Sequence, residues 1–349
     1  MGFISQLFNL LTSRITSAKT MTPSSLHELT ANITPKLKKQ NGNISIENDW
    51  LTIDSPYFFG QAYLSANKHW VVGCSDFDGN GRGGHRESGF GTVVLVNKPT
   101  FRILHKLRTI ARPFNAAVAD TGDYIVHDAG FGSALQADLI AIDVEGNENF
   151  RRHYEANIYN IGISHCGKYA SVQTAAAPGK DGNILEVINL WSKTTIFSIK
   201  PEYGWADSYF FDLDENGGLR SLKVKCKNIG YFRYTAIGIP IDVEAYKDAC
   251  LYKGNFNLKV EAARALLREH PSEKNAQKAL KAIEMALNEG AKDRTDWAAA
   301  AFRIKGEAND LLGNFSDALD AYEKALSFNP KIGVQRRVNA LRKKLQRLK

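Results

Sequence analysis

The amino-acid sequence changes character at Gly238-Ile239-Pro240, and this change limits the chain to folds with two parts. From about residue 45 to 240, short runs rich in Val, Ile, Tyr, Phe and Thr are broken by Gly, Asn and Asp roughly every 8–12 residues, which predicts strands. After that point Ala, Leu, Lys and Glu recur at helical spacing. Because 349 residues exceed what one core usually organises, we expect a β domain over 44–240 and a helical domain over 241–349.

The β half contains a weak internal repeat. Each unit is a strand, a turn, a strand led by an aromatic residue, a loop, and two further strands joined by a turn. The leading aromatic residues Trp70, Tyr124 and Tyr169 stand 54 and 45 residues apart, and a less regular fourth unit begins near Tyr209. We expect about four to five four-stranded units, with Ile44–Ile53 completing a unit or forming a fifth.

This pattern resembles WD-repeat and quinoprotein-like β-propellers over about 190 residues, although no Trp-Asp dipeptide ends any unit. The resemblance implies twisted sheets that stack radially, because one such sheet alone leaves an apolar face uncovered. An irregular β-sandwich would show the same rhythm of turns and is the alternative.

Residues 299–330 predict two closely packed helices. Small side chains fall where the helices of a hairpin must approach, and large side chains fall between them. Pro330 ends the second helix. The small residues are Gly306, Ala308, Gly313, Ala318 and Ala325, and the large ones are Phe302, Leu312, Phe315 and Tyr322.

The segment resembles a tetratricopeptide (TPR) repeat, with Lys305 and Asn309 where that family's first helix usually carries Leu and Tyr. The spacing from Gly313-Asn314-Phe315 to Pro330 also occurs from Gly254-Asn255-Phe256 to Pro271. We therefore expect about six helices in a C-terminal α-solenoid of TPR-like hairpins, ending in a basic helix near 332–348. The resemblance implies a surface for a partner protein, on which we predict Asn255, Arg303 and Asn309 as binding residues.

The sharpest motif for chemistry is the run from residue 76 to 87. Asp76, Asp78 and Asn80 supply oxygen side chains at alternate positions, Gly81 allows the turn, and Glu87 follows at the spacing of a calcium-binding loop. The sequence thus predicts a metal site for calcium, the one cofactor we consider. The flanking segments are strands rather than helices, so the alternative is that these residues simply build a turn.

The formal net charge of +8 is concentrated at the C-terminus. Residues 331–349 carry eight Lys and Arg and no acidic residue, so the rest of the chain is neutral. Such a tail would bind nucleic acid or an acidic membrane. Its apolar stripe, which includes Val338, Leu341 and Leu345, instead favours a helix that covers the open end of the solenoid.

Other features favour binding over catalysis. The sequence has no GxSxG, no P-loop and no GxGxxG followed by a helix, since the glycines near 81–84 precede a predicted strand, and its histidines are dispersed. Four scattered cysteines and no membrane-spanning stretch indicate a cytoplasmic protein. Residues 1–43 predict an amphipathic helix and a linker; because the first 27 residues lack acidic side chains, a mitochondrial location is the alternative.

The function that we expect is that of a non-enzymatic adaptor, which binds a partner peptide or domain of unknown identity through the solenoid and the propeller surface. The alternative is a calcium- or metal-dependent β-propeller enzyme, of the hydrolase or lyase type, with the helices as an oligomerisation appendage.

Overall fold

The structure is a computed structural model that describes residues 44–78, 83–84 and 87–347. The predicted N-terminal helix and linker at 1–43 lie outside these residues. The chain divides into two compact units: the first extends to Gly182 and includes Leu190–Lys193, and the second contains Asn183–Asn189 and Thr194–Lys349. None of the described helices combines the length and the apolar character that a membrane crossing needs.

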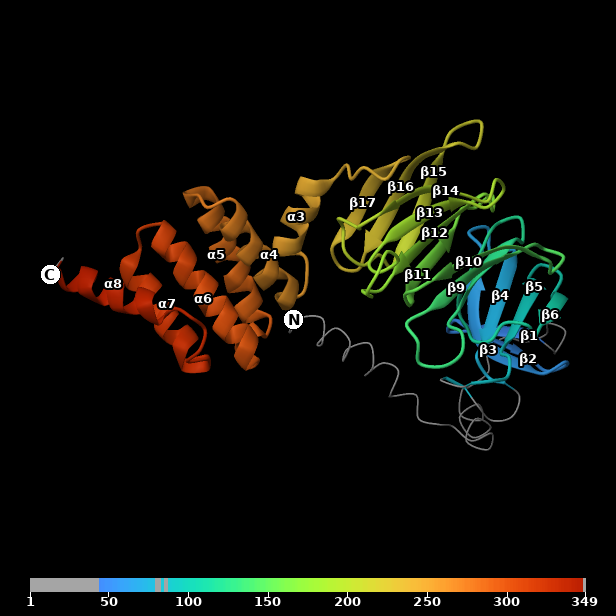
Figure 1. The fold of residues 1–349 in the computed structure, drawn as a ribbon, viewed down its shortest axis with the longest axis horizontal. Coiled ribbons are helices and arrows are strands. Elements are labelled where there is room, and N and C mark those ends of the chain that lie inside the picture. The colour runs from blue at the N-terminus through green and yellow to red at the C-terminus, as the bar shows by residue number, and fades with distance from the viewer. Residues whose placement is uncertain (1–43, 79–82, 85–86, 348–349) are drawn as a thin grey trace. The chain divides into compact units, whose positions relative to one another are not determined.

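The N-terminal part is β-propeller-like, as the sequence predicts, and is built from antiparallel sheets whose strands follow one another in chain order (Figure 1). The first sheet contains β1 (Ile44–Glu47), β2 (Trp50–Ile53), β3 (Phe58–Leu64), β4 (Trp70–Ser75), β5 (Thr92–Asn97) and β6 (Arg102–Leu107). The second contains β7 (Pro113–Val118), β8 (Tyr124–Asp128), β9 (Ala137–Ile142) and β10 (Glu148–Tyr154).

The third sheet contains β11 (Ile158–Ile163), β12 (Tyr169–Thr174), β13 (Leu185–Asn189) and β14 (Thr194–Ile199). The fourth contains β15 (Ser208–Leu213), β16 (Leu219–Cys226) and β17 (Gly230–Thr235).

Two details differ from the expectation of uniform four-stranded units. Ile44–Ile53 forms the hairpin β1–β2, which pairs with β3 and makes the first sheet six-stranded instead of forming a fifth unit. The fourth sheet has three strands, because the chain turns back at Gly238 (φ 83°) and makes a single bridge, from Tyr234 to Pro240. Proline has no N–H to donate, so it cannot continue a strand ladder.

The aromatic residues that mark the repeat lead equivalent strands. Trp70, Tyr124 and Tyr169 begin β4, β8 and β12. In two of the units a serine builds the turn before them: Ser65 Oγ accepts from Trp70 N at 3.0 Å, and Ser164 Oγ accepts from Tyr169 N at 2.9 Å. The repeat therefore reflects a shared turn geometry and not only composition.

Successive turns are also joined to one another. The backbone N–H of Asn67 donates to Asp120 Oδ1 at 2.8 Å, and the indole N–H of Trp70 donates to the carbonyl of Asp120 at 3.1 Å. The N–H of Asp120 in turn donates to the carbonyl of His165 at 2.8 Å. Between the first two sheets lies an apolar core that includes Val72 and Leu95 on one side and Tyr124 and Ile140 on the other.

Six helices follow among the described residues, which confirms the expected number. They are α3 (Val243–Tyr252), α4 (Phe256–Glu269), α5 (Glu273–Asn288), α6 (Thr295–Leu311), α7 (Phe315–Phe328) and α8 (Gln335–Arg347). Each packs against the next, and in addition α3 contacts α5 and α4 contacts α6. The structure places the last helix, α8, within the segment expected near 332–348.

Gly306 in α6 shows how closely the helices approach. A Cβ at this position would lie 2.5 Å from Cδ1 of Tyr322 in α7, closer than side-chain carbons normally come. The ring of Tyr322 is buried and fills the space that the glycine leaves. A small residue is therefore required at this point of the α6–α7 contact.

We expect Gly306→Ala to destabilise the helical region by about 1–3 kcal/mol, because overpacking outweighs the roughly 1 kcal/mol by which Ala is favoured over Gly in a helix. Urea unfolding monitored by circular dichroism measures the change. In a Tyr322→Ala background the same substitution should lose its cost, and Ser316→Ala, at an exposed position of α7, serves as the control. Stabilisation by Gly306→Ala alone would contradict the close contact.

Candidate functional site

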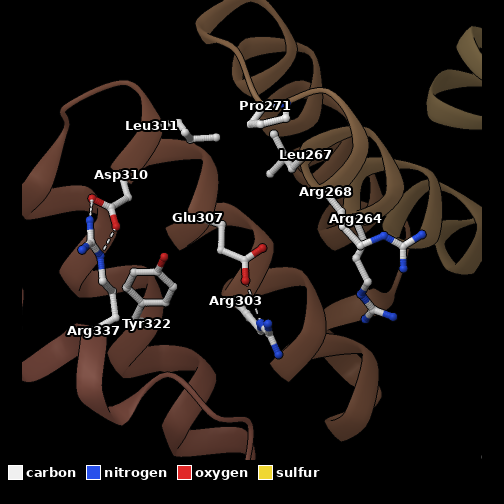
Figure 2. A pocket seen from close by; sticks show the side chains of 10 residues that line it. All are labelled: Arg264, Leu267, Arg268, Pro271, Arg303, Glu307, Asp310, Leu311, Tyr322 and Arg337. Atoms are coloured by element: carbon white, nitrogen blue, oxygen red, sulfur yellow. Dashed lines mark hydrogen bonds and ion pairs between the residues drawn. The ribbon is translucent and has the colours of Figure 1, made fainter.

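A pocket of about 490 Å³ opens between helices α4 and α6 (Figure 2). We call it the arginine pocket. It is lined by Arg264, Leu267, Arg268, Pro271, Arg303, Glu307, Asp310, Leu311, Tyr322 and Arg337.

Helical periodicity places these residues together. On α4 the lining positions 264, 267 and 268 are three or four residues apart, as are 303, 307 and 310 on α6, so each set occupies one face of its helix. Because α4 and α6 contact each other, the two faces form adjoining walls. Tyr322 from α7 and Arg337 from α8 complete the lining.

The floor of the pocket is apolar and its walls are charged. Leu267 is 6% exposed and the ring of Tyr322 is 3% exposed. Burial, with the nearby carboxylates of Asp310 and Glu307, raises the pKa of the Tyr322 phenol, so the hydroxyl stays protonated. A protonated phenol can both donate and accept a hydrogen bond.

Four arginines and two carboxylates line this pocket, and the carboxylates of Glu261 and Glu269 pair with two of the arginines from outside the lining. Arg337 forms a two-pronged ion pair with Asp310. Arg303 Nε donates to Glu307 at 2.7 Å, and its Nη1 donates to the carbonyl of Ile332 at 3.2 Å. Guanidinium groups bind carboxylates and phosphates in a fixed geometry, so the lining suits an acidic segment.

The remaining two arginines are anchored from outside the lining. Arg264 Nη1 donates to Glu261 Oε1 at 2.8 Å, and Arg268 Nη2 donates to Glu269 Oε1 at 3.1 Å. Since these exposed pairs are worth little in water, both guanidinium groups can exchange their partners for those of a ligand.

The structure separates the three residues that the sequence predicts for partner binding. Arg303 lines the arginine pocket. Asn255 caps α4, where its side chain accepts from Leu258 N at 3.0 Å. Asn309 is 4% exposed, and its amide donates to the carbonyl of Lys305 at 3.1 Å. The sequence pattern does not single out Arg264, Arg268 or Arg337, although the four-residue spacing of the first two is a signal.

The basic C-terminal helix packs on the helical region. Val338 and Leu341 of α8 are buried in an apolar cluster with Tyr322 of α7. Part of the positive charge of α8 is paired, since Arg337 contacts Asp310 and Arg342 Nη2 donates to Glu323 at 2.6 Å. The helix thus has the apolar inner side expected for a cap of the stack.

Residues of the predicted calcium loop lie partly outside the described residues, and Asn80 is among those outside. Asp76 Oδ2 accepts from Gly84 N at 2.6 Å and lies 3.8 Å from Arg112 Nε. Asp78 is 6% exposed, and Glu87 lies beside Gly132. No group of three or more His, Cys, Asp or Glu in the described ranges could hold a metal ion, and the calcium site stays a prediction.

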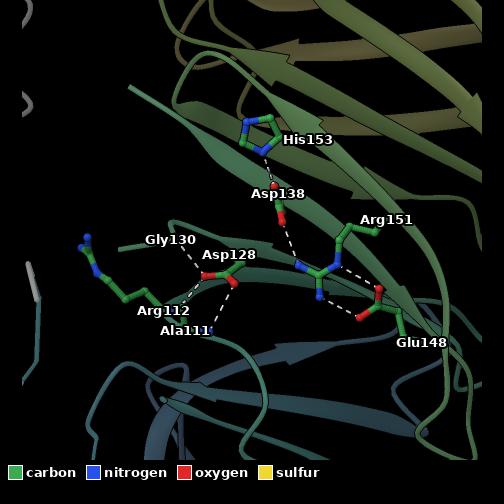
Figure 3. Close-up of polar contacts among 8 residues, drawn as sticks. All are labelled: Ala111, Arg112, Asp128, Gly130, Asp138, Glu148, Arg151 and His153. Carbon is green, nitrogen blue, oxygen red and sulfur yellow. Dashed lines mark hydrogen bonds and ion pairs between the residues drawn. The ribbon is translucent and has the colours of Figure 1, made fainter. Parts of the chain in front are cut away.

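Near this loop, a buried carboxylate holds two connections together (Figure 3). Asp128, at the end of β8, accepts hydrogen bonds from the backbone N–H groups of Ala111, Arg112 and Gly130 at 3.2, 2.8 and 3.0 Å. It therefore fixes the β6–β7 connection to the β8–β9 loop. These three donors are backbone N–H groups, so the carboxylate has a structural role at this point of the sheet.

A second polar cluster in Figure 3 lies on β9 and β10. Asp138 accepts from Arg151 Nη1 at 2.7 Å and lies 2.6 Å from His153 Nδ1, while Glu148 accepts from Arg151 Nη2 at 2.7 Å. The hydrogen bonds that Arg151 donates to Glu148 raise the pKa of its guanidinium group. The contacts of Asp138 with Arg151 and His153 join β9 to β10 on a solvated face and favour their register, whereas the pair between Arg151 and Glu148 lies within β10.

Comparison with known proteins identifies no relative by sequence. No known protein family and no curated protein matches the chain. Solved structures that it resembles include the β-propeller domain of Myceliophteria thermophila Cps50 (Swd1), at 13% identity and a TM-score of 0.32, covering 58% of this chain and 68% of that one.

Two further structures show a similar degree of likeness. The WD40 domain of Neurospora crassa Pan2 has 8% identity and a TM-score of 0.34, and the match covers 58% of this chain and 61% of that one. HIRA(644–1017) has 11% identity and a TM-score of 0.35, and the match covers 80% of this chain and 94% of that one. The description of the fold therefore depends on the strand pairing of the chain itself.

His127 on β8 makes the stability of the fold depend on pH. The ring is 4% exposed, and its Nδ1 has no hydrogen-bond partner among the described residues. Burial, assisted by the positive charge of Arg112, lowers the pKa of His127 to about 3. The native state keeps this ring neutral over a range in which the unfolded chain becomes protonated.

We expect the His127 contribution to stability to be fully present above the unfolded pKa near 6.5 and to be lost as the pH falls from there toward 3. At pH 5 the loss should reach about 2 kcal/mol. Urea unfolding at pH 7.5 and pH 5 measures it. His127→Gln should flatten this dependence, whereas His165→Gln, at an exposed position, should leave it unchanged. Equal slopes in wild type and His127→Gln would contradict the assignment.

Proposed function

We propose that this protein is a non-enzymatic adaptor that holds an acidic, extended segment of a partner protein in the arginine pocket. The observation that carries the proposal is the set of four arginines around the buried side chains of Leu267 and Tyr322; among the described residues, two of these arginines pair only with carboxylates outside the lining. Apolar floors provide affinity and flanking guanidinium groups select acidic side chains.

The composition of the pocket supports binding rather than catalysis. Its ten lining residues include no His, Cys or Ser, the groups that most often act as nucleophile or proton carrier. Its carboxylates already pair with Arg303 and Arg337. A ligand would therefore be held by exchange of ion pairs, with no group placed to attack it.

The proposal includes a TPR-like solenoid for the six helices. The contact between Gly306 and Tyr322 supports it, as does the contact of α3 with α5 and of α4 with α6, which gives the helices two layers. A stack of helices holds its surface in place before a ligand arrives, so that mainly the ligand loses conformational freedom on binding.

We place the adaptor in the cytoplasm. All four cysteines are free thiols, and Cys74, Cys226 and Cys250 are buried. Burial raises the pKa of the Cys226 thiol to about 12, so this thiol stays protonated and unreactive. Free thiols agree with a reducing compartment.

A labelled peptide of about 12 residues that alternates Glu and Leu tests the pocket, with a peptide that carries Gln in place of Glu as its match. We expect the full chain to bind the Glu peptide, and the double variant Arg264→Glu, Arg268→Glu to bind it at least about tenfold more weakly, because two attractive contacts become repulsive. Fluorescence anisotropy measures the affinities.

Lys274→Glu is the matched control, since it reverses one exposed charge of α5 outside the pocket. Its affinity should stay within about twofold of wild type. Binding of the Glu peptide should also weaken as salt is raised. If the Glu and Gln peptides bind equally, or if the double arginine variant keeps wild-type affinity, the acidic-peptide function is wrong.

A further inference from the structure

The fourth sheet presents one buried face and one exposed face. Its inner side chains, such as Tyr209, Leu222 and Phe232, join an apolar core. The outward side chains follow from the register: Phe210 pairs with Lys223, and Lys225 pairs with Tyr231. Alternate residues of a strand point to opposite faces, so these four share the exposed side.

The segment after β17 extends this exposed face. Thr235 N donates to the carbonyl of Ile239 at 2.8 Å, and Ile241 N donates to the carbonyl of Arg233 at 2.9 Å. The segment therefore runs back alongside β17, with Tyr234 bridged to Pro240. Since Ile239 and Ile241 pair with outward-facing residues, their side chains lie on the same side as Tyr231.

The result is a partly apolar, partly basic surface, which we call the outer sheet face. It is formed by Phe210, Lys223, Lys225, Tyr231, Ile239 and Ile241. Its four large apolar side chains are 46% to 56% exposed. Several large apolar side chains exposed on one face of a sheet indicate an interaction site, because sheets normally cover such a face.

Two contacts organise the outer sheet face. The rings of Phe210 and Tyr231 meet across β16, with centroids 5.8 Å apart. The ammonium group of Lys225 lies 5.9 Å from the centre of the Tyr231 ring. The lysines of β16 therefore stand in the middle of the apolar residues and not at their margin.

We propose that the outer sheet face is a docking site for an amphipathic helix of a partner protein, with acidic side chains beside its apolar stripe. The apolar stripe would cover Phe210, Tyr231 and the two isoleucines, and the acidic side chains would reach Lys223 and Lys225. This surface is separate from the arginine pocket and does not depend on it.

Geometry at the edge favours a helix over an added strand. A strand would need the outward N–H and carbonyl groups of β17. The N–H of Arg233 already donates to Asp242 Oδ2 at 2.9 Å, and its carbonyl accepts from Ile241. The partner must therefore lie on the face, where a helix fits a twisted sheet.

The positive charge of the outer sheet face disfavours two other occupants, a second copy of this chain and its own N-terminal segment. A second copy of this chain would bring Lys223 and Lys225 against the same residues of its mate, which is unfavourable. The first 27 residues of this chain are apolar and basic, with no acidic side chain, so they would meet the same repulsion. The positive charge of Arg233 is matched by Asp242, which leaves the two lysines for an external carboxylate.

The test uses the full chain and a synthetic helical peptide of about 18 residues, with Leu at one face and Glu on both flanks; its match carries Lys in place of Glu. We expect saturable binding of the Glu peptide, measured by fluorescence anisotropy. Affinity should fall at least tenfold in each of two double variants. One is Lys223→Glu with Lys225→Glu, and the other is Ile239→Ser with Ile241→Ser. Lys274→Glu, at an exposed position of α5 outside both surfaces, should leave it unchanged. Arg268→Glu reports any binding that the arginine pocket contributes, and circular dichroism verifies that each variant folds.

Every other outcome overturns the proposal. Equal affinity for the Glu and Lys peptides, no saturable binding of the Glu peptide, or weakening only by Arg268→Glu would each exclude a helix-docking face. Vesicles with about 30% phosphatidylserine and a single-stranded oligonucleotide are probes for the two other acidic classes. If either binds in a manner that Lys223→Glu, Lys225→Glu abolishes, while the peptide does not bind, the face belongs to that class.

Discussion

The passage from sheet to helices depends on one tyrosine. The hydroxyl of Tyr203 donates to the carbonyl of Arg233 at 3.1 Å and accepts from the N–H of Asp242 at 2.7 Å, so it joins the end of the fourth sheet to the start of α3. Its ring packs on Tyr234 and Tyr246, with centroids 4.6 and 5.3 Å away. An ion pair between Arg233 Nη2 and Asp242 Oδ1, 2.8 Å apart, lies beside these hydrogen bonds. The carboxylate of Asp242 makes no capping bond to α3, because it is used in this junction.

Because of this junction, the apolar core continues across residues 238–240, where the sequence changes from strand-like to helical. The apolar core of the fourth sheet includes Ala249 of α3, and Tyr246 packs against it. The secondary structure changes there while the core continues. Exposed pairs such as Arg233 and Asp242 add little stability by themselves, so the aromatic packing carries the connection.

The features that the sequence predicts well are local ones. Trp70, Tyr124 and Tyr169 begin equivalent strands because each follows a tight turn whose residues specify it. The helices follow from apolar spacing and from proline stops. The pairing of β1–β2 with β3 could not be predicted, since the choice of neighbour for an alternating strand depends on tertiary contacts. The position of Arg264 and Arg268 in a pocket could not be predicted for a similar reason, because a charged helix face has the same sequence pattern whether it faces solvent or lines a pocket.

The hydrogen bonds from Asn67 and Trp70 to Asp120, and from Asp120 to His165, have a consequence for how this molecule can vary in length. An insertion in one of these turns would displace the acceptor that a neighbouring sheet requires, and the disturbance would pass from sheet to sheet. Between the β4–β5 and β8–β9 connections, the described residues meet through side chains instead, with the ring centroids of Phe90 and Phe131 6.1 Å apart. Engineered fusions should therefore keep the lengths of the turns at residues 65–69, 119–123 and 164–168 unchanged.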